Sequence, residues 1–293
     1  MDYYIRDLKM ELLEEIEERY IEVNGVKLHT VIVGKGEPII LLHGFYDFWY
    51  SWKDVMIALK DEYKLIVPDT RGINTSEKPE GVDNYYPEVL INDVKVLAEV
   101  LELGKFILVG HDWGGSIALG FATMYPELLK KLIVLNTMHS GLLAKLIRTD
   151  KEFRSSASYQ LDFIKKGSED TLAPQDWESF NDNLLAKKDD FDKEMYLKAW
   201  KQPGALKAGL NYYRAAYKRA REGKNPEDWG GKIDVPTLVI WGKKDKVLRP
   251  ILASGLEDFI PNIKIVWSEE AGHFILADDP KIVISSIREF IQD

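Results

Sequence analysis

The segment Gly110-His111-Asp112-Trp113-Gly114-Gly115 has the residue types of a reactive turn, with a carboxylate between glycines. It follows an apolar run over residues 106–109 and precedes a helical pattern over residues 116–124. Glycines permit a tight turn and close backbone approach. At a helix N-terminus, Asp112 would gain from the dipole and from free N–H groups. Taken alone, the segment could equally be a glycine-rich turn with a capping aspartate.

Two further polar residues follow apolar, strand-like runs later in the chain. Asp245 comes after the run over residues 237–240, and His273 comes after the run over residues 263–267. Singly, Asp245 could lie in a solvated surface turn and His273 could be a packed histidine. The order nucleophile, acid, histidine at successive strand ends is the order of a nucleophile-elbow triad. We therefore predict that Asp112, Asp245 and His273 act together.

A short loop after the apolar run over residues 38–42 completes this arrangement. In folds with a nucleophile elbow, such a loop supplies one oxyanion-binding N–H, and the residue after the nucleophile supplies the other. Here these donors would be the backbone amides of Phe45 and Trp113. His43 is expected to shape the loop and not to carry a proton.

An aspartate nucleophile restricts the chemistry. Attack on an acyl carbon would give an anhydride, whereas attack on an alkyl carbon gives an ordinary ester that water can hydrolyse. The substrate should therefore be an epoxide or a carbon that bears a halide. His273, oriented by Asp245, would deprotonate the water that attacks the Asp112 ester. A departing alkoxide needs a proton donor such as tyrosine, but a halide does not.

The elements that must position these residues follow an alternation of strand and helix. Apolar runs at residues 38–42, 65–67, 106–109 and 132–135 alternate with helical patterns, and the pattern resumes after residue 237. This alternation indicates a mostly parallel, twisted sheet flanked by helices. Asn24-Gly25 between β-branched runs predicts a hairpin. Residues 139–228 have only helical patterns, which indicates a helical lid inserted over the carboxyl edge of the sheet.

We thus predict an α/β-hydrolase fold with its core in residues 1–138 and 229–293 and its lid in residues 139–228. The core would begin with an amphipathic helix over residues 1–19, since Leu8, Leu12, Leu13 and Ile16 recur among glutamates.

Composition excludes several classes of function. The 293 residues have a net charge of -9, which disfavours nucleic acid as a partner. There is no cysteine, so disulfides, thiolate catalysis and cysteine metal sites are excluded. No metal ion or cofactor is expected. The N-terminus lacks a signal-peptide pattern and no apolar run has membrane-spanning length, so we expect a cytoplasmic protein without membrane contact. A homodimer is possible.

From about residue 20 to its end, the chain resembles the α/β-hydrolase epoxide hydrolases. The similar motifs are His43-Gly44-Phe45-Tyr46-Asp47-Phe48-Trp49-Tyr50-Ser51-Trp52, Asp69-Thr70-Arg71-Gly72 and His111-Asp112-Trp113-Gly114-Gly115. Two lid segments, Tyr159-Gln160-Leu161 and Leu210-Asn211-Tyr212-Tyr213-Arg214, match the places of the family's ring-opening tyrosines. The resemblance implies that Tyr159 and Tyr213 assist ring opening of a small hydrophobic epoxide. Tyr46 departs from the family, which usually has proline there.

We expect the substrate pocket to be lined by His43, Gly44, Trp113, Gln160, Tyr212 and Phe274. Either lid tyrosine could instead be packed by its ring, and Tyr212 could take the place of Tyr213. The nearest alternative function is a haloalkane dehalogenase with the same nucleophile. Phe45, where many dehalogenases have asparagine, and the tyrosine pair favour the epoxide. A ligand-binding protein that has lost catalysis is a further alternative, against which the intact triad argues.

Overall fold

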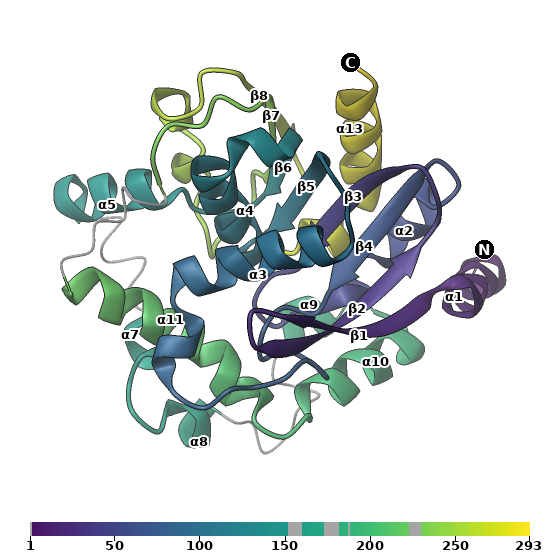
Figure 1. Ribbon diagram of the computed structural model, residues 1–293, viewed down its shortest axis with the longest axis horizontal. Helices are drawn as coiled ribbons and strands as arrows, with labels where there is room; N and C mark the ends of the chain where they lie inside the picture. The colour runs from purple at the N-terminus through teal and green to yellow at the C-terminus, as the bar shows by residue number, and fades with distance from the viewer. Residues whose placement is uncertain (1, 152–159, 173–181, 187, 223–229) are drawn as a thin grey trace.

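The structure is a computed structural model that describes residues 2–151, 160–172, 182–186, 188–222 and 230–293. Within these residues, eight strands form one sheet in the order β1-β2-β4-β3-β5-β6-β7-β8 (Figure 1). Only β2 runs against the others, so the predicted mostly parallel sheet is confirmed. The strands are β1 (Glu17–Val23), β2 (Val26–Val33), β3 (Glu37–Leu42), β4 (Tyr63–Pro68), β5 (Phe106–His111), β6 (Leu129–Leu135), β7 (Thr237–Gly242) and β8 (Ile263–Ser268).

The central strands are buried on both faces. In β3, Ile40 and Leu42 enter the core beneath α3 (Pro87–Val100) and α4 (Trp113–Met124). Ile39 and Leu41 enter the core beneath α2 (Lys53–Leu59) and α13 (Pro280–Gln292). The same alternation holds in β5 and β6, which explains the apolar runs over residues 106–109 and 132–135. Each such side chain contributes roughly 1.5–3 kcal/mol relative to its exposed state.

The helices that flank the sheet follow from amphipathic patterns in the sequence. Helix α3 begins with Pro87. Proline suits the first helical position because an N–H there would have no partner within the helix. The flanking elements are η1 (Trp49–Trp52), α2 (Lys53–Leu59), η2 (Val82–Tyr85), α3 (Pro87–Val100), α4 (Trp113–Met124), η3 (Pro126–Leu128), η6 (Pro250–Leu252), η7 (Leu256–Asp258), α12 (Ile275–Asp278) and α13 (Pro280–Gln292). Helix α4 starts at Trp113, three residues earlier than the pattern from residue 116 predicts.

In the described part of the chain between β6 and β7, the α-helices are α5 (Ser140–Thr149), α7 (Gln160–Phe163), α8 (Ser168–Leu172), α9 (Asp182–Leu185), α10 (Asp190–Trp200) and α11 (Ala205–Arg221). Helices α7 to α11 lie together in the lower part of Figure 1. The Tyr196 hydroxyl of α10 donates to Asp47 at 2.9 Å, and the Tyr212 hydroxyl of α11 donates to the Arg71 carbonyl at 2.7 Å. Helices α10 and α11 therefore contact the loops that follow β3 and β4. The exact division into core and lid stays a prediction.

The N-terminal helix is shorter than predicted. Helix α1 (Asp2–Glu15) ends before residue 19, and β1 begins at Glu17. The prediction was wrong because pairing of β1 with β2 extends across the whole hairpin, from Val23 opposite Val26 to Glu17 opposite Ile32. Asn24 and Gly25 both have positive φ, +47° and +76°, as a two-residue turn between twisted strands requires.

Among the described residues, no helix combines the length and the apolar character needed to cross a membrane.

Candidate active site

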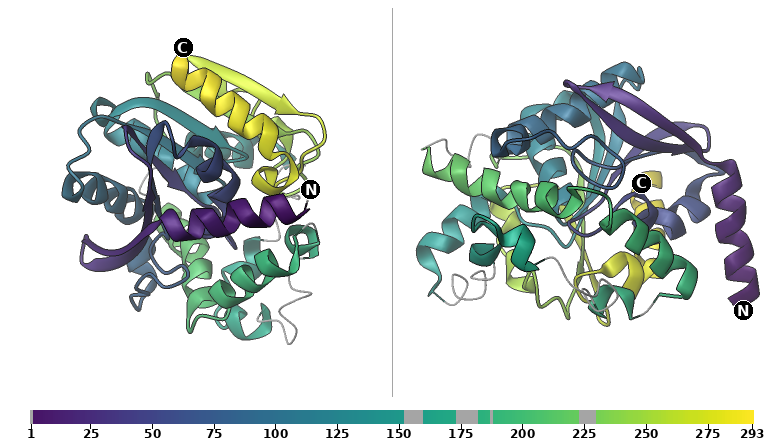
Figure 2. Two further views of the ribbon diagram at one scale, coloured as in Figure 1. Left: turned by 90° about the vertical axis from the view of Figure 1, so that its right-hand side faces the viewer. Right: turned by 90° about the horizontal axis from the view of Figure 1, so that it is seen from below.

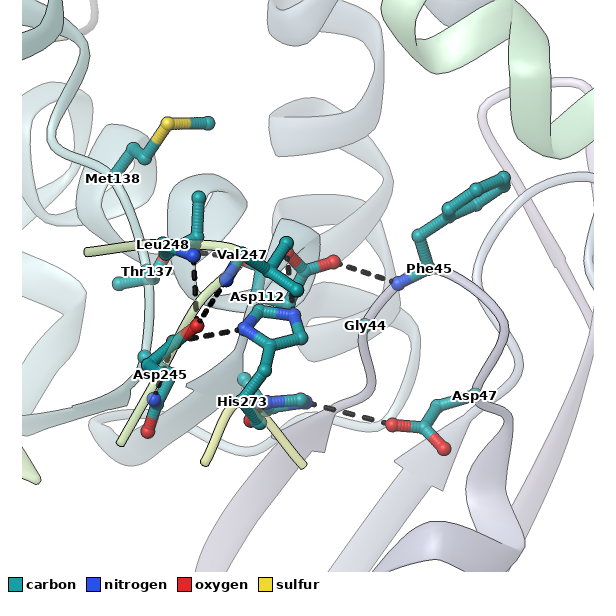
Figure 3. A network of polar contacts seen from close by, with 12 residues as sticks. Gly44, Phe45, Asp47, Asp112, Thr137, Met138, Asp245, Val247, Leu248 and His273 are labelled. Carbon is teal, nitrogen blue, oxygen red and sulfur yellow. Dashed lines mark hydrogen bonds and ion pairs between the residues drawn. The ribbon is translucent and has the colours of Figure 1, made fainter. Parts of the chain in front are cut away.

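Asp112 occupies the sharp turn between β5 and α4. Its φ of +51° and ψ of -118° are strained for a residue with a side chain. A Cβ atom on Gly114 would lie 2.3 Å from the carbonyl oxygen of Leu42, so close backbone approach requires glycine there. The turn aims the Asp112 carboxylate at the loop after β3 and at His273 (Figure 3).

The two carboxylate oxygens of Asp112 have different partners. Oδ1 accepts a hydrogen bond from the Phe45 backbone amide at 2.8 Å. Oδ2 lies 3.5 Å from Nε2 of His273. Gly44 leaves room for this arrangement, since a Cβ atom there would lie 2.7 Å from the Asp112 Cβ. One oxygen is thus held by an amide while the other faces the imidazole.

Asp245 holds the other side of the imidazole. Its Oδ2 lies 3.0 Å from Nδ1 of His273, and its Oδ1 accepts from the amides of Val247 and Leu248, both at 2.8 Å. The Asp245 side chain is fully buried, so it is not part of a solvated turn. The three residues predicted as a triad come together in the predicted order (Figure 3).

Sequence reasoning missed Asn136, which lies directly after β6. Its side-chain amide donates to Oδ2 of Asp245 at 2.7 Å and to the Gly272 carbonyl at 3.2 Å. The signal was available, since β6 is the neighbour of β7 in the sheet and their carboxyl ends meet. Asn136 therefore holds Oδ2 of Asp245, the carboxylate oxygen that the loop amides do not contact.

Asp112 and His273 form an ion pair. Burial opposes a charge on His273, but its contacts with Asp112 and Asp245 outweigh that cost and raise the His273 pKa to about 10. Burial also opposes the charge on Asp112. Contacts with His273 and with the Phe45 amide nevertheless lower the Asp112 pKa. The carboxylate is therefore ionised and the imidazole is protonated near neutral pH.

His43 shapes the loop after β3, as predicted. Its Nδ1 donates to the Gly44 carbonyl at 2.9 Å, and its Nε2 accepts from the Thr70 amide at 3.0 Å. Both ring nitrogens are thus occupied by backbone groups. In this loop the Phe45-Tyr46 peptide is trans, and Tyr46 has a φ of +68°.

The two adjacent lid tyrosines have different surroundings. The Tyr213 ring lies 5.1 Å, centre to centre, from the rings of both Phe45 and Trp113, edge-on to each. The Tyr212 hydroxyl is instead bound to Arg71 and lies 3.0 Å from Oγ1 of Thr70. Both rings lie against Trp113, that of Tyr212 at 5.5 Å, but of the two Tyr213 is the one whose ring also packs against Phe45. Tyr159 lies outside the described residues.

Apart from Gln160, the predicted pocket residues lie beside the triad or the loop after β3. His43, Gly44, Trp113 and Tyr212 share a small void of about 10 Å³ with Phe45, Thr70, Ile73 and Gly209. Gln160 is buried at the start of α7, and the Phe274 ring lies 5.2 Å from that of His273. Within the described residues, no group of three His, Cys, Asp or Glu side chains is placed to hold a metal ion.

Comparisons with known proteins agree with this geometry. The sequence model of the alpha/beta hydrolase fold family matches residues 37–280. The AB hydrolase superfamily protein YfhM of Bacillus subtilis (strain 168) is 35% identical over 294 residues, which cover 96% of this chain and 100% of that protein. Epoxide hydrolase 1 of Caenorhabditis elegans is 32% identical, over 97% of this chain and 72% of that protein. The crystal structure of Bacillus megaterium epoxide hydrolase in complex with an inhibitor has a TM-score of 0.86 at 29% identity, over 94% of this chain and 100% of that one. The chain therefore belongs to the α/β-hydrolase fold family and is related over nearly its whole length to epoxide hydrolases.

Proposed function

We propose that this protein is an epoxide hydrolase, which converts small hydrophobic epoxides to vicinal diols through an alkyl ester on Asp112. The observation that carries the proposal is the division of the Asp112 carboxylate, with Oδ1 on the Phe45 amide and Oδ2 facing His273. A carboxylate nucleophile suits an alkyl electrophile because the product is an ordinary ester. Similarity to proteins named epoxide hydrolases supports the same choice.

In the first step, Oδ2 of Asp112 attacks one ring carbon of the epoxide. The carbon–oxygen bond of the ring breaks, and its electron pair goes to the ring oxygen, which takes a proton. Tyr213 is the candidate donor in the described part of the lid, and its ring packs against Phe45 and Trp113. Tyr159 is proposed as the second donor.

In the second step, water hydrolyses the ester. Alkylation removes the negative charge of Asp112, which is one of the two charges that raise the His273 pKa. That pKa must then fall, and the proton that the imidazolium releases returns to the tyrosinate left by ring opening, which makes a neutral imidazole available as the base. Water loses a proton to Nε2 and attacks Cγ of Asp112. The resulting negative charge falls on Oδ1, which already accepts from the Phe45 amide, with the Trp113 amide as the second donor.

The intermediate then collapses. The bond from Cγ to Oδ2 breaks, and the diol leaves with the proton that His273 took from water. The new carboxylic acid of Asp112 then gives its proton to Nε2 of His273, which regenerates the resting ion pair. The oxygen of the water therefore enters Asp112, and the diol of the first turnover keeps the Oδ2 atom of the protein.

Two measurements test the proposal. His273→Gln should accumulate the ester, so intact mass should rise by one epoxide and the label should map to the peptide with Asp112. His29→Gln is the matched control, because His29 is a buried histidine beside a carboxylate outside the site. In ¹⁸O-water, a single turnover should give unlabelled diol. Label on another residue, or halide release from haloalkanes with no diol from any epoxide, would contradict the proposal.

A further inference from the structure

The loop that carries the Phe45 amide contains a residue in an unfavourable conformation. Tyr46 follows Phe45 directly and has a φ of +68°, a region that L residues with large side chains rarely occupy. The loop closes on itself through a long hydrogen bond, from the Asp47 amide to the Gly44 carbonyl at 3.2 Å. Such a conformation persists only where the surroundings hold it.

Helix α10 of the lid holds this loop at two consecutive residues. The Trp200 indole N–H donates to the Tyr46 carbonyl at 2.7 Å, and the Tyr196 hydroxyl donates to Oδ1 of Asp47 at 2.9 Å. Residues four apart lie on the same face of a helix, so both donors point the same way. Trp200 and Tyr196 are 7% and 1% exposed, so solvent competes little for these bonds.

The same face of α10 is anchored one turn earlier. Asp192 accepts from the Tyr50 hydroxyl of η1 at 2.8 Å and from Lys9 of α1 at 2.8 Å. The Lys9 contact ties helix α1 to α10, and the left view of Figure 2 shows α1 running above the lid helices. Helix α10 is therefore fixed to the core along three successive turns, and the last of these reaches the strained residue.

We propose that Trp200 is a positioning residue for the reaction, which holds Tyr46 in its strained conformation so that the Phe45 amide points at Oδ1 of Asp112. This inference rests on the proposed function, because it assigns the Phe45 amide a role in ester hydrolysis. Trp200 acts through the Tyr46 carbonyl and needs no contact with the substrate.

The two chemical steps should respond differently to a loss of this contact. Charge develops on Oδ1 only when water attacks the ester, so a misplaced Phe45 amide should slow ester hydrolysis. During ring opening the carboxylate loses negative charge, and the amide gives no advantage to that step. A general loss of structure would slow both steps together.

The experiment compares single-turnover rates in Trp200→Phe, which removes the indole N–H. We expect ester hydrolysis to slow by roughly 10- to 100-fold, the scale of small misplacements in active sites, while ester formation stays near the parent rate. Adding Tyr46→Asn should restore part of the hydrolysis rate, because asparagine tolerates positive φ better than tyrosine. Tyr85→Phe is the matched control, since it removes a buried aromatic donor to the Pro79 carbonyl and should leave both rates unchanged.

A second measurement does not depend on epoxide turnover. Hydrogen exchange of the Phe45 amide, followed by NMR, should become faster in Trp200→Phe and stay at the parent rate in Tyr85→Phe. If the parent protein opens no epoxide, the proposed function fails, and amide exchange still decides the role of Trp200. Unchanged exchange at Phe45, or equal slowing of both chemical steps, would overturn the inference.

Discussion

At the scale of single residues, Asp112 and His273 hold opposite charges 3.5 Å apart in the resting protein. Asp112→Asn removes the negative charge and nearly preserves the shape of the side chain. We expect the His273 pKa to fall from about 10 toward its ordinary value of about 6.5, since Asp245 alone would then oppose the cost of burial. NMR titration of the His273 ring measures this shift. If the His273 pKa stayed near its parent value, Asp112 would not be what stabilises the protonated imidazole.

The two adjacent tyrosines of α11 should separate activity from stability. Tyr213→Phe should slow ring opening, because it removes the proposed proton donor. Tyr212→Phe removes the bond to the Arg71 carbonyl and should lower that free energy by about 0.5–1.5 kcal/mol, with ring opening nearly unchanged. Single-turnover kinetics and urea unfolding of both variants check the pair. The reverse result would exchange the roles of Tyr212 and Tyr213.

The sequence predicted the residues of the site better than their supports. Asp112, Asp245 and His273 are recognisable because each follows a strand-like run, and strand order then brings them together. Asn136 was missed although its place directly after β6, beside the end of β7, was an available signal. Trp200 was missed because a tryptophan in a helical pattern does not indicate which loop of the core it will contact.

At the scale of elements, α1 is tied to α10 by a buried lysine. Lys9 donates to Asp189 at 2.7 Å and to Asp192 at 2.8 Å, and it is 4% exposed. Lys9→Met should lower the free energy of unfolding by about 1.5–3 kcal/mol, the range of charge-assisted hydrogen bonds. We expect no larger loss, because Lys53 and Tyr50 remain as partners of the buried Asp192.

Urea unfolding measures this change, and Lys145→Met is the matched control. Lys145 pairs with Asp258 at 3.1 Å, where both side chains are more than half exposed, so its loss should cost no more than about 1 kcal/mol. An equal cost for both variants would mean that burial adds nothing to the Lys9 contacts.

Local patterns predicted these elements well where one interaction dominates. The Asn24-Gly25 turn and the apolar central strands are examples, because turn chemistry and burial on both faces leave few alternatives. The predicted end of the N-terminal helix was wrong. Glu17, Glu18 and Arg19 suit a helix in isolation, but pairing with β2 places them in a strand.

At the scale of the whole molecule, two buried histidines outside the site should give stability a maximum near neutral pH. Burial opposes a charge on His29, but Asp69 and Glu18 outweigh it and raise the His29 pKa. Its contribution is complete below the ordinary value of about 6.5 and is lost as pH rises through the raised pKa. Burial lowers the His139 pKa to about 4, so unfolding takes up a proton between about pH 6.5 and 4, and stability falls as pH falls.

Urea unfolding at a series of pH values above and below about 6.5 measures both losses of stability. His29→Gln should reduce part of the loss of stability above about pH 6.5, to which His273 with its raised pKa also contributes, and His139→Gln should reduce part of the loss below that pH. If the free energy of unfolding changed equally with pH in the parent and in both variants, neither histidine would be a source of the pH dependence.

The lid as a whole was the hardest part to predict. Its helices have ordinary amphipathic patterns, and such a pattern does not say which loop of the core a face will meet. The docking of α10 on residues 46 and 47 follows from tertiary contacts alone. The fold class could be predicted because alternating strands and helices restrict how the chain can be wound.

The sheet has a free edge at β1, and this strand carries Glu17, Glu18, Arg19 and Glu22 exposed along it. An exposed strand edge can recruit the same strand from another molecule and start a fibrous aggregate. Here β1 of an approaching copy would bring the same glutamates, so negatively charged carboxylates would face one another and would have to lose their bound water before the strands could pair. The exposed acidic residues of β1 thus discourage copies of this protein from joining edge to edge.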